Sequence, residues 1–303
     1  MKQEMQAASE EISALLKSMS DLVRGNIEEI SFRAEDIRVR LCPPPGILGL
    51  PATRVELEVD PDDFRDVPFS SLRDASYEVL ITRLLLALGS TSRVFLDVGS
   101  NIGFYCALLG KSFPDLIVHG IEPNSFLWRR WENNKEINGL GGRCVLHKAG
   151  LATIDEDSFF FLPSVTGSGG GSLKVLHPDE AQQKITVSLR TPDSLALPNE
   201  LSLIKIDVEG AEYDVVRALE TRLSESRPTI IIELLRKWMA PFNSRPQDVV
   251  EILRGLDYTS FAVGSDTITP VDEINNQTLE TNFLFIHKEN NDHLEKSSNF
   301  LER

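Results

Sequence analysis

The residues best suited to chemistry in this 303-residue chain lie in two short segments about a hundred positions apart. Residues 94–103 read Val-Phe-Leu-Asp-Val-Gly-Ser-Asn-Ile-Gly, and residues 203–212 read Leu-Ile-Lys-Ile-Asp-Val-Glu-Gly-Ala-Glu. Each segment is an apolar stretch followed by acidic and glycine residues. This pattern predicts a buried strand that brings carboxylates and a tight turn to one edge of a sheet. We therefore expect a ligand site where these two strands end.

The first segment predicts a site for a cofactor that contains ribose. Gly99 and Gly103 permit a tight turn and a close approach to a ligand, and a helix that begins near 103 would present unpaired N–H groups. Glu122 follows the next apolar stretch, 25 positions after Asp97, and could bond ribose hydroxyls. Asn101 replaces the second glycine of the dinucleotide fingerprint, and a carboxylate at 97 would repel a pyrophosphate. The turn therefore favours S-adenosylmethionine, with its ammonium and sulfonium, over NAD.

The second segment predicts a polar cluster. Lys205 and Asp207 are two positions apart in a predicted strand, so their side chains lie on the same face. A lysine in a buried strand needs a charged partner, and Asp207 or Glu233 could provide it. One interpretation is a structural salt bridge between neighbouring strands. The other is that Asp207 and Glu209 face the acceptor of a transferred methyl group, with Lys205 positioning a catalytic carboxylate. The two interpretations are compatible.

Methyl transfer from S-adenosylmethionine to an acceptor that carries a proton benefits from a base that removes the proton as the new bond forms. An aspartate is a weak base and Lys205 favours its charged form, so Asp207 is expected either as the base or as an orienting group. His177, which follows a glycine-rich loop, is a competing base. Asp207, Glu209 and Glu233 could also bind magnesium or calcium, but their spacing is not diagnostic, and we predict no metal site.

Four pieces of the chain, at 97–103, 121–124, 205–212 and 228–233, resemble the FkbM-type family of S-adenosylmethionine-dependent methyltransferases. They occur in the family's order, and Lys-Ile-Asp-Val-Glu-Gly-Ala-Glu is the most specific of them. The resemblance implies an α/β class I methyltransferase-like fold, a doubly wound sheet of about seven strands with an antiparallel last pair. It also implies methylation of a hydroxyl on a glycan or a secondary metabolite. The predicted cofactor residues are Asp97, Gly99, Asn101, Gly103 and Glu122, and the predicted catalytic residues are Lys205, Asp207 and Glu209.

Apolar stretches alternate with helical patterns from residue 77 onward, which is typical of a parallel sheet with covered faces. The predicted strands are 93–98, 116–121, 143–148, 201–207 and 228–233, with a closing hairpin at 258–263 and 281–287. An insertion at 155–190 contains a predicted strand pair and the glycine-rich loop 167–172. We expect this loop to be either a substrate lid or a floppy hairpin tip.

The chain divides into three predicted parts: an N-terminal appendage of a helix and short strands (1–72), an S-adenosylmethionine-binding domain (73–290) and a disordered tail (291–303). Apolar residues between 5 and 22 recur at spacings of three and four. They predict a helix that either packs on its own domain or forms a homodimer. Alternating residues at 37–41 and 55–59 predict two strands of the appendage.

The formal net charge of −15 and the absence of a basic stripe argue against binding to nucleic acid or to an acidic membrane. The N-terminus lacks the apolar core of a signal peptide, and the three cysteines lack metal spacing. We therefore expect a cytoplasmic protein whose partner is a small-molecule or glycan acceptor. Two alternatives stay open: an NAD-dependent oxidoreductase, and a non-catalytic scaffold that dimerises through its N-terminal helix.

Overall fold

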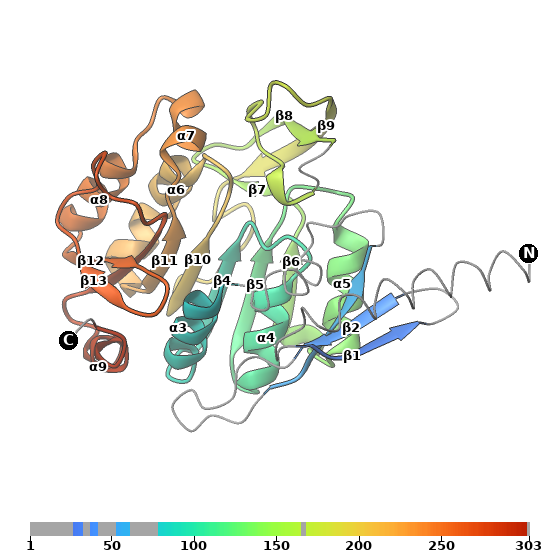
Figure 1. Cartoon of the computed structure of the whole chain (residues 1–303), viewed down its shortest axis with the longest axis horizontal. Helices are drawn as coiled ribbons and strands as arrows, with labels where there is room; N and C mark the ends of the chain where they lie inside the picture. Colours follow the sequence, from blue (N-terminus) through green and yellow to red (C-terminus); the bar gives the residue numbers. More distant parts are fainter. Residues whose placement is uncertain (1–26, 33–36, 42–52, 61–77, 165–167, 302–303) are drawn as a thin grey trace, which may run out of the picture.

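A computed structural model of the chain describes residues 27–32, 37–41, 53–60, 78–164 and 168–301. Its centre is an eight-stranded sheet in the order β13-β12-β14-β11-β10-β4-β5-β6 (Figure 1). The strands are β4 (Val94–Val98), β5 (Ile117–Ile121), β6 (Cys144–His147), β10 (Leu203–Ile206), β11 (Thr229–Glu233), β12 (Tyr258–Val263), β13 (Ile268–Pro270) and β14 (Asn282–His287). Strands β11, β10, β4, β5 and β6 are parallel, whereas β14 pairs antiparallel with both β11 and β12.

The predicted doubly wound sheet with an antiparallel end is therefore confirmed. The count is eight rather than about seven, because the three-residue strand β13 pairs with the edge of β12. So short a strand shows no alternation that would reveal it in the sequence.

Helices cover both faces of this sheet (Figure 1). Helices α3 (Val79–Gly89), α4 (Phe104–Ser112) and α5 (Trp128–Ile137) belong to one apolar core, and α6 (Glu212–Ser226) and α8 (Pro246–Gly255) belong to the other. Neighbouring residues of β4 serve the two cores alternately, since Phe95 packs in the first and Leu96 in the second. Burial on both faces explains why the central strands are apolar throughout.

The insertion forms a small sheet of β7 (Gly150–Leu151), β8 (Glu156–Pro163) and β9 (Gln182–Arg190), in the order β7-β9-β8. The antiparallel pair β8–β9 confirms the predicted strand pair. This hairpin lies beyond one end of the large sheet, past the tips of its parallel strands (Figure 1). It is therefore placed to form a wall above the carboxyl edge.

The N-terminal part contains an antiparallel sheet of β1 (Ile27–Phe32), β2 (Ile37–Leu41) and β3 (Val55–Val59). The strands predicted at 37–41 and 55–59 are confirmed, and β1 was not predicted. The sheet packs its apolar side chains into the same core as α4 and α5, through Val39, Leu41, Val55 and Leu57. The predicted helix and dimer seam at 5–22 lie outside the described residues.

A disordered tail was predicted at 291–303, and for the described residues 291–301 this is wrong, because α9 spans Asn291–Ser298. Asn290 caps this helix by accepting a hydrogen bond from the backbone N–H of His293, at 3.2 Å. The His293 ring is buried, with Nδ1 2.6 Å from Thr229 Oγ1 of β11. Among the described residues, no helix has both the length and the apolar character to cross a bilayer.

Candidate functional site

Four carboxylates from four adjacent strands meet at the carboxyl edge of the sheet. Asp97 lies in β4, Glu122 follows β5, Asp207 follows β10, and Glu233 ends β11, and these strands are neighbours in the order β11-β10-β4-β5. All four side chains line one cavity of about 310 Å³. The cavity lies where ligands bind in open α/β sheets.

The structure also brings Gly99, Asn101, Lys205 and Glu209 to this cavity, but it does not bring Gly103 there. A Cβ atom on Gly103 would lie 2.8 Å from Nε1 of Trp131. Gly99 and Gly103 both have positive φ, 82° and 81° respectively. A Cβ atom on Gly99 would lie 1.8 Å from the backbone oxygen of Asp207. Packing of the protein on itself and the left-handed backbone are therefore enough to require glycine at both positions, and the close approach of a ligand to Gly99 stays a prediction.

Asp97 is almost fully buried, at 1% exposure. Its Oδ2 accepts a weak hydrogen bond from Cys106 Sγ at 3.5 Å, whereas its Oδ1 has no hydrogen-bond partner within the part of the chain that is described. Asn101 also lines the cavity, and its Oδ1 is buried and receives no hydrogen bond from any residue that the structure describes. Burial raises the pKa of Asp97 to about 6, against the opposing charge of Lys205. Buried acceptors without donors are costly, so the two orphaned oxygens fit a ligand that donates hydrogen bonds.

Glu122 accepts two backbone hydrogen bonds, both at 2.8 Å: from Asn101 N to Oε2 and from Asn124 N to Oε1. It thereby ties the turn after β4 to the end of β5. Burial raises the pKa of Glu122 to about 8, although these two N–H groups oppose the shift. Each oxygen keeps a second lone pair, which is free to accept from a hydroxyl group.

Lys205 and Asp207 form the predicted ion pair, with Nζ 2.9 Å from Oδ2. Lys205 is only 5% exposed, and its neighbours in register are Asp97 in β4 and Ile231 in β11. It is the single lysine or arginine among the described residues that line the cavity. Lys205 thus stands between the predicted cofactor carboxylate and the predicted catalytic carboxylate.

Sequence reasoning missed two polar groups of the cavity, Glu78 and Tyr105. The hydroxyl of Tyr105 in α4 donates to Glu78 Oε2 at 2.6 Å. Burial raises the pKa of Glu78, although Lys205 opposes the shift. Glu78 immediately precedes α3 and has no motif around it, so its place in the site comes only from tertiary packing.

Three cavity residues other than glycine have backbone in the left-handed region: Glu78 (φ 42°), Asn101 (φ 50°) and Glu209 (φ 52°). This conformation costs on the order of 1 kcal/mol for each such residue, and it persists where the surrounding structure imposes it. Ser172 helps to fix Glu209, because its hydroxyl donates to the backbone oxygen of Glu209 at 2.7 Å. Backbone strain of this kind gathers at functional sites.

The glycine-rich loop forms part of the cavity wall through Gly169 and Gly171. Ser172 is buried and exchanges two backbone hydrogen bonds with Phe161 of β8, at 2.8 and 3.1 Å. A Cβ atom on Gly171 would lie 2.5 Å from the Phe160 ring. Gly171 and Ser172 are therefore packed on the hairpin, where the loop forms part of the cavity wall.

His177, the competing base, does not line the cavity. Its ring lies against Trp238, with centroids 4.9 Å apart, and its Nδ1 is 3.5 Å from Glu180. This position does not support a role as the base. The described residues contain no group of three or more His, Cys, Asp or Glu side chains arranged to hold a metal ion.

The ligand-free protein is expected to lose stability as the pH rises from 6 to 9. Burial and the neighbouring carboxylates Asp207 and Glu233 raise the pKa of Glu209 to about 9. Between the ordinary pKa of 4.5 and this value, the native state holds a proton that the unfolded state has lost, so the stability present at low pH falls by about 1.4 kcal/mol per pH unit. Melting temperatures measured between pH 6 and 9 would show the fall, and Glu209→Gln should make it shallower, whereas Glu122 and Glu233, whose pKa values burial raises to about 8, keep their own contributions to it. A melting temperature that is independent of pH over this range would contradict the prediction.

The chain matches the family model described as the methyltransferase FkbM domain over residues 97–298. It is 26% identical over 157 residues to Methyltransferase 1 of Beauveria bassiana, a match that covers 46% of this chain and 63% of the relative. It is 27% identical over 166 residues to the hexuronic acid methyltransferase AglP of Haloferax volcanii, which covers 54% of this chain and 64% of the relative. Both matches span less than two thirds of the relative's own length.

Among solved structures, the chain is similar to a methyltransferase FkbM from Methylobacillus flagellatus, with 16% identity and a TM-score of 0.42 over 75% of this chain and 55% of that one. It is also similar to the O-methyltransferase TomG from Streptomyces achromogenes, solved in complex with SAM. There the identity is 12% and the TM-score 0.41, over 76% of this chain and 91% of that one.

Proposed function

Because the chain belongs to the FkbM methyltransferase family, we propose that it transfers a methyl group from S-adenosylmethionine to a hydroxyl group of a glycan or a secondary metabolite. One observation supports this most directly: the buried Oδ1 of Asp97 has no donor among the described residues and lies in an acid-lined cavity at the carboxyl edge of the sheet. S-adenosylmethionine carries its methyl group on a sulfonium and also has an ammonium group. A cavity that presents carboxylates to its ligand suits both positive charges.

The residues at the β4 and β5 ends would hold the cofactor. We assign Asp97 Oδ1 to the ammonium, with the second orphaned oxygen, Asn101 Oδ1, beside it. Glu122 would accept ribose hydroxyls with its remaining lone pairs, since its two hydrogen bonds to backbone N–H groups already fix its orientation. The apolar side chains of Leu151 and Leu189, which line the same cavity, suit an adenine ring.

The residues at the β10 and β11 ends would serve the acceptor. Lys205 holds Asp207 in place through the 2.9 Å ion pair, which lets Asp207 orient the hydroxyl by accepting its hydrogen bond. The proton must leave as the new bond forms. Glu209 would accept this proton in its ionised form, and because burial beside Asp207 and Glu233 raises its pKa to about 9, methyl transfer through Glu209 should increase as the pH rises toward that value.

The charge of the cavity bears on the acceptor. Six carboxylate residues and one lysine are present among the lining residues: Glu78, Asp97, Glu122, Asp207, Glu209, Glu233 and Lys205. Burial already raises the pKa of Glu122 and Glu233 to about 8 and that of Glu209 to about 9, so the cavity disfavours negative charge, and a carboxylate on the acceptor would be disfavoured in the same way. We therefore propose a neutral or cationic acceptor, in contrast to the hexuronic acid that one relative's name gives as its substrate.

Calorimetric titration with S-adenosylhomocysteine, the demethylated product, tests the proposed function. We expect one-to-one binding, and at a hundredfold excess over Kd the ligand should stabilise the protein by about 2.7 kcal/mol. NAD titrated in the same way should give no heat of binding. NAD binding without S-adenosylhomocysteine binding would favour the oxidoreductase, and binding of neither ligand would leave the scaffold hypothesis.

Asp207→Asn is expected to lower methyl transfer by about a hundredfold or more and to leave the Kd of S-adenosylhomocysteine within about threefold. The substitution keeps the shape of the side chain but removes the charge that Lys205 holds toward the acceptor. Labelled S-adenosylmethionine with a panel of neutral sugar and polyketide acceptors would measure transfer. Asp157→Asn, at an exposed strand position, is the matched control. A variant with full transfer would remove Asp207 from the mechanism.

A further inference from the structure

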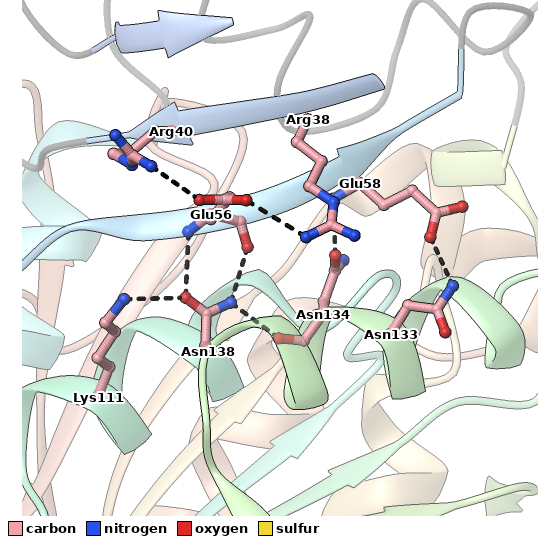
Figure 2. Close-up of polar contacts among 8 residues, drawn as sticks. All are labelled: Arg38, Arg40, Glu56, Glu58, Lys111, Asn133, Asn134 and Asn138. Carbon is pink, nitrogen blue, oxygen red and sulfur yellow. Dashed lines mark hydrogen bonds and ion pairs between the residues drawn. The ribbon is translucent and has the colours of Figure 1, made fainter. Parts of the chain in front are cut away.

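The open edge of β3 is met by two asparagine side chains, Asn134 of α5 and Asn138 at the C-cap of the same helix, instead of by another strand (Figure 2). Asn138 Oδ1 accepts from the backbone N–H of Glu56 at 3.1 Å, and Asn138 Nδ2 donates to the Glu56 oxygen at 2.7 Å. One helical turn earlier, Asn134 Oδ1 accepts from the backbone N–H of Glu58 at 2.7 Å. Residues two apart on a strand edge thus pair with residues four apart on one helix face. The two amides take the place of a neighbouring strand.

Asn134 has a further contact that Asn138 lacks. Its Nδ2 donates to the backbone oxygen of Ile102 at 2.9 Å, and the residue is fully buried. Ile102 belongs to the turn 99–103, between Asn101, which lines the cavity, and Gly103. Asn134 therefore connects the backbone of the N-terminal sheet directly to the turn beside the cavity.

We infer that Asn134 is a positioning residue for the turn 99–103, which we take to hold the cofactor. Through Asn134, the N-terminal sheet is then a structural part of the cofactor site. This inference rests on the proposed function, since it takes the ligand of the turn to be S-adenosylmethionine.

The chemistry of the amide supports this role. The Asn134 side chain must accept from the Glu58 N–H and donate to the Ile102 carbonyl at the same time, so it needs an acceptor and a donor on one short side chain. These two contacts fix the amide with Oδ1 toward β3 and Nδ2 toward the turn. Both contacts are buried, so a lost partner leaves an uncompensated polar group. The turn has one other support from α5, the hydrogen bond from Trp131 Nε1 to Ser100 Oγ at 3.1 Å. Asn134 and Trp131 thus hold the turn at two points and set where Asn101 meets Glu122.

Asn138 provides a matched control, because it holds the same strand without touching the turn. Its Nδ2 donates to the oxygens of Glu56 and Asn134, at 2.7 and 2.8 Å. Asn→Asp at either position keeps the acceptor for β3 and removes the donor, in nearly the same volume. Only Asn134→Asp places a carboxylate against the Ile102 oxygen.

The test is the Kd of S-adenosylhomocysteine for the full chain and both variants, with melting temperatures measured alongside. We expect Asn134→Asp to raise Kd at least tenfold and Asn138→Asp to leave it within about twofold, even if both variants melt earlier. A merely structural role would lower the melting temperature of both and leave Kd unchanged, and Asn134→Asp with the wild-type Kd would overturn the inference. Wild-type protein that binds no S-adenosylhomocysteine would instead contradict the proposed function, and the inference with it.

Amide hydrogen exchange of the wild-type protein keeps the inference testable if Asn134→Asp does not fold. Coupling between two sites is reciprocal, so a ligand that fixes the turn should also slow exchange at the Glu58 N–H, on the far side of Asn134. We expect S-adenosylhomocysteine to protect residues 55–59 several-fold and to leave α9 unchanged. Protection of residues 98–103 without protection of 55–59 would overturn the inference.

Discussion

Asp97→Asn is expected to bind S-adenosylhomocysteine at least thirtyfold more weakly than the wild-type protein. The substitution leaves the volume unchanged but removes the charge and puts an amide where a buried carboxylate would face an ammonium. Removing one partner from a buried charge pair costs about 2–5 kcal/mol, which corresponds to about thirtyfold or more in Kd. Because Asp97 is 1% exposed, little water is available to replace the lost contact.

The same substitution should not destabilise the ligand-free protein at pH 7. Burial raises the pKa of Asp97 from 3.8 to about 6, so at pH 7 the native state holds a buried charge that is less stable there than in the unfolded chain, and a neutral asparagine removes this cost. Calorimetry together with thermal melting checks both expectations, and Asp157→Asn controls for the change of residue type. Undiminished affinity in the Asp97→Asn variant would contradict the cofactor assignment.

Gly99→Ala is expected to lower the free energy of unfolding by about 3 kcal/mol or more, and to abolish cofactor binding in any protein that folds. The left-handed backbone of Gly99 would cost an alanine about 1–2 kcal/mol. The new Cβ atom would also lie 1.8 Å from the Asp207 backbone oxygen and 2.8 Å from its carbonyl carbon. Because those are backbone atoms, the ends of β4 and β10 would have to move apart, which adds an overpacking cost of about 1–3 kcal/mol.

Gly139→Ala separates the two contributions. Gly139 also has positive φ, at 68°, but a Cβ atom there would meet nothing within 4 Å. This control should lose only the conformational part, about 1–2 kcal/mol, and should bind ligand normally. Urea denaturation of both variants measures the difference. Equal losses in the two variants would show that the close approach of Gly99 to Asp207 does not matter.

The carboxyl edge of the sheet could be predicted because its signal is local. An apolar stretch followed by Asp97, Glu122, Asp207 or Glu233 indicates both the strand and the end at which the acid lies. Parallel strands then bring those ends together, whatever their order. The ion pair between Lys205 and Asp207 followed from their spacing of two in a buried strand.

The features that escaped prediction depend on contacts between residues far apart in the sequence. Glu78 lines the cavity and is held there by a hydrogen bond from Tyr105, 27 positions later. No periodic pattern in the sequence indicates this position. Asn134 reads as an ordinary polar position of a helix, although it meets Glu58 across 76 residues. The tight turn at Gly99 was predicted, whereas its contact with the Asp207 backbone was not, because the sequence does not show that β10 ends beside it. In each case the deciding neighbour is set by the tertiary fold.

The pairing of β3 with α5 has a consequence for biosynthesis. Glu56 and Asn138 are 82 positions apart, so β3 leaves the ribosome well before the helix that closes its edge. Until α5 follows, the backbone N–H and C=O groups of that edge are open to pairing with other chains. Slow translation or a stall between these positions should therefore favour aggregation of the nascent chain. Rapid translation through residues 128–138 should reduce this aggregation.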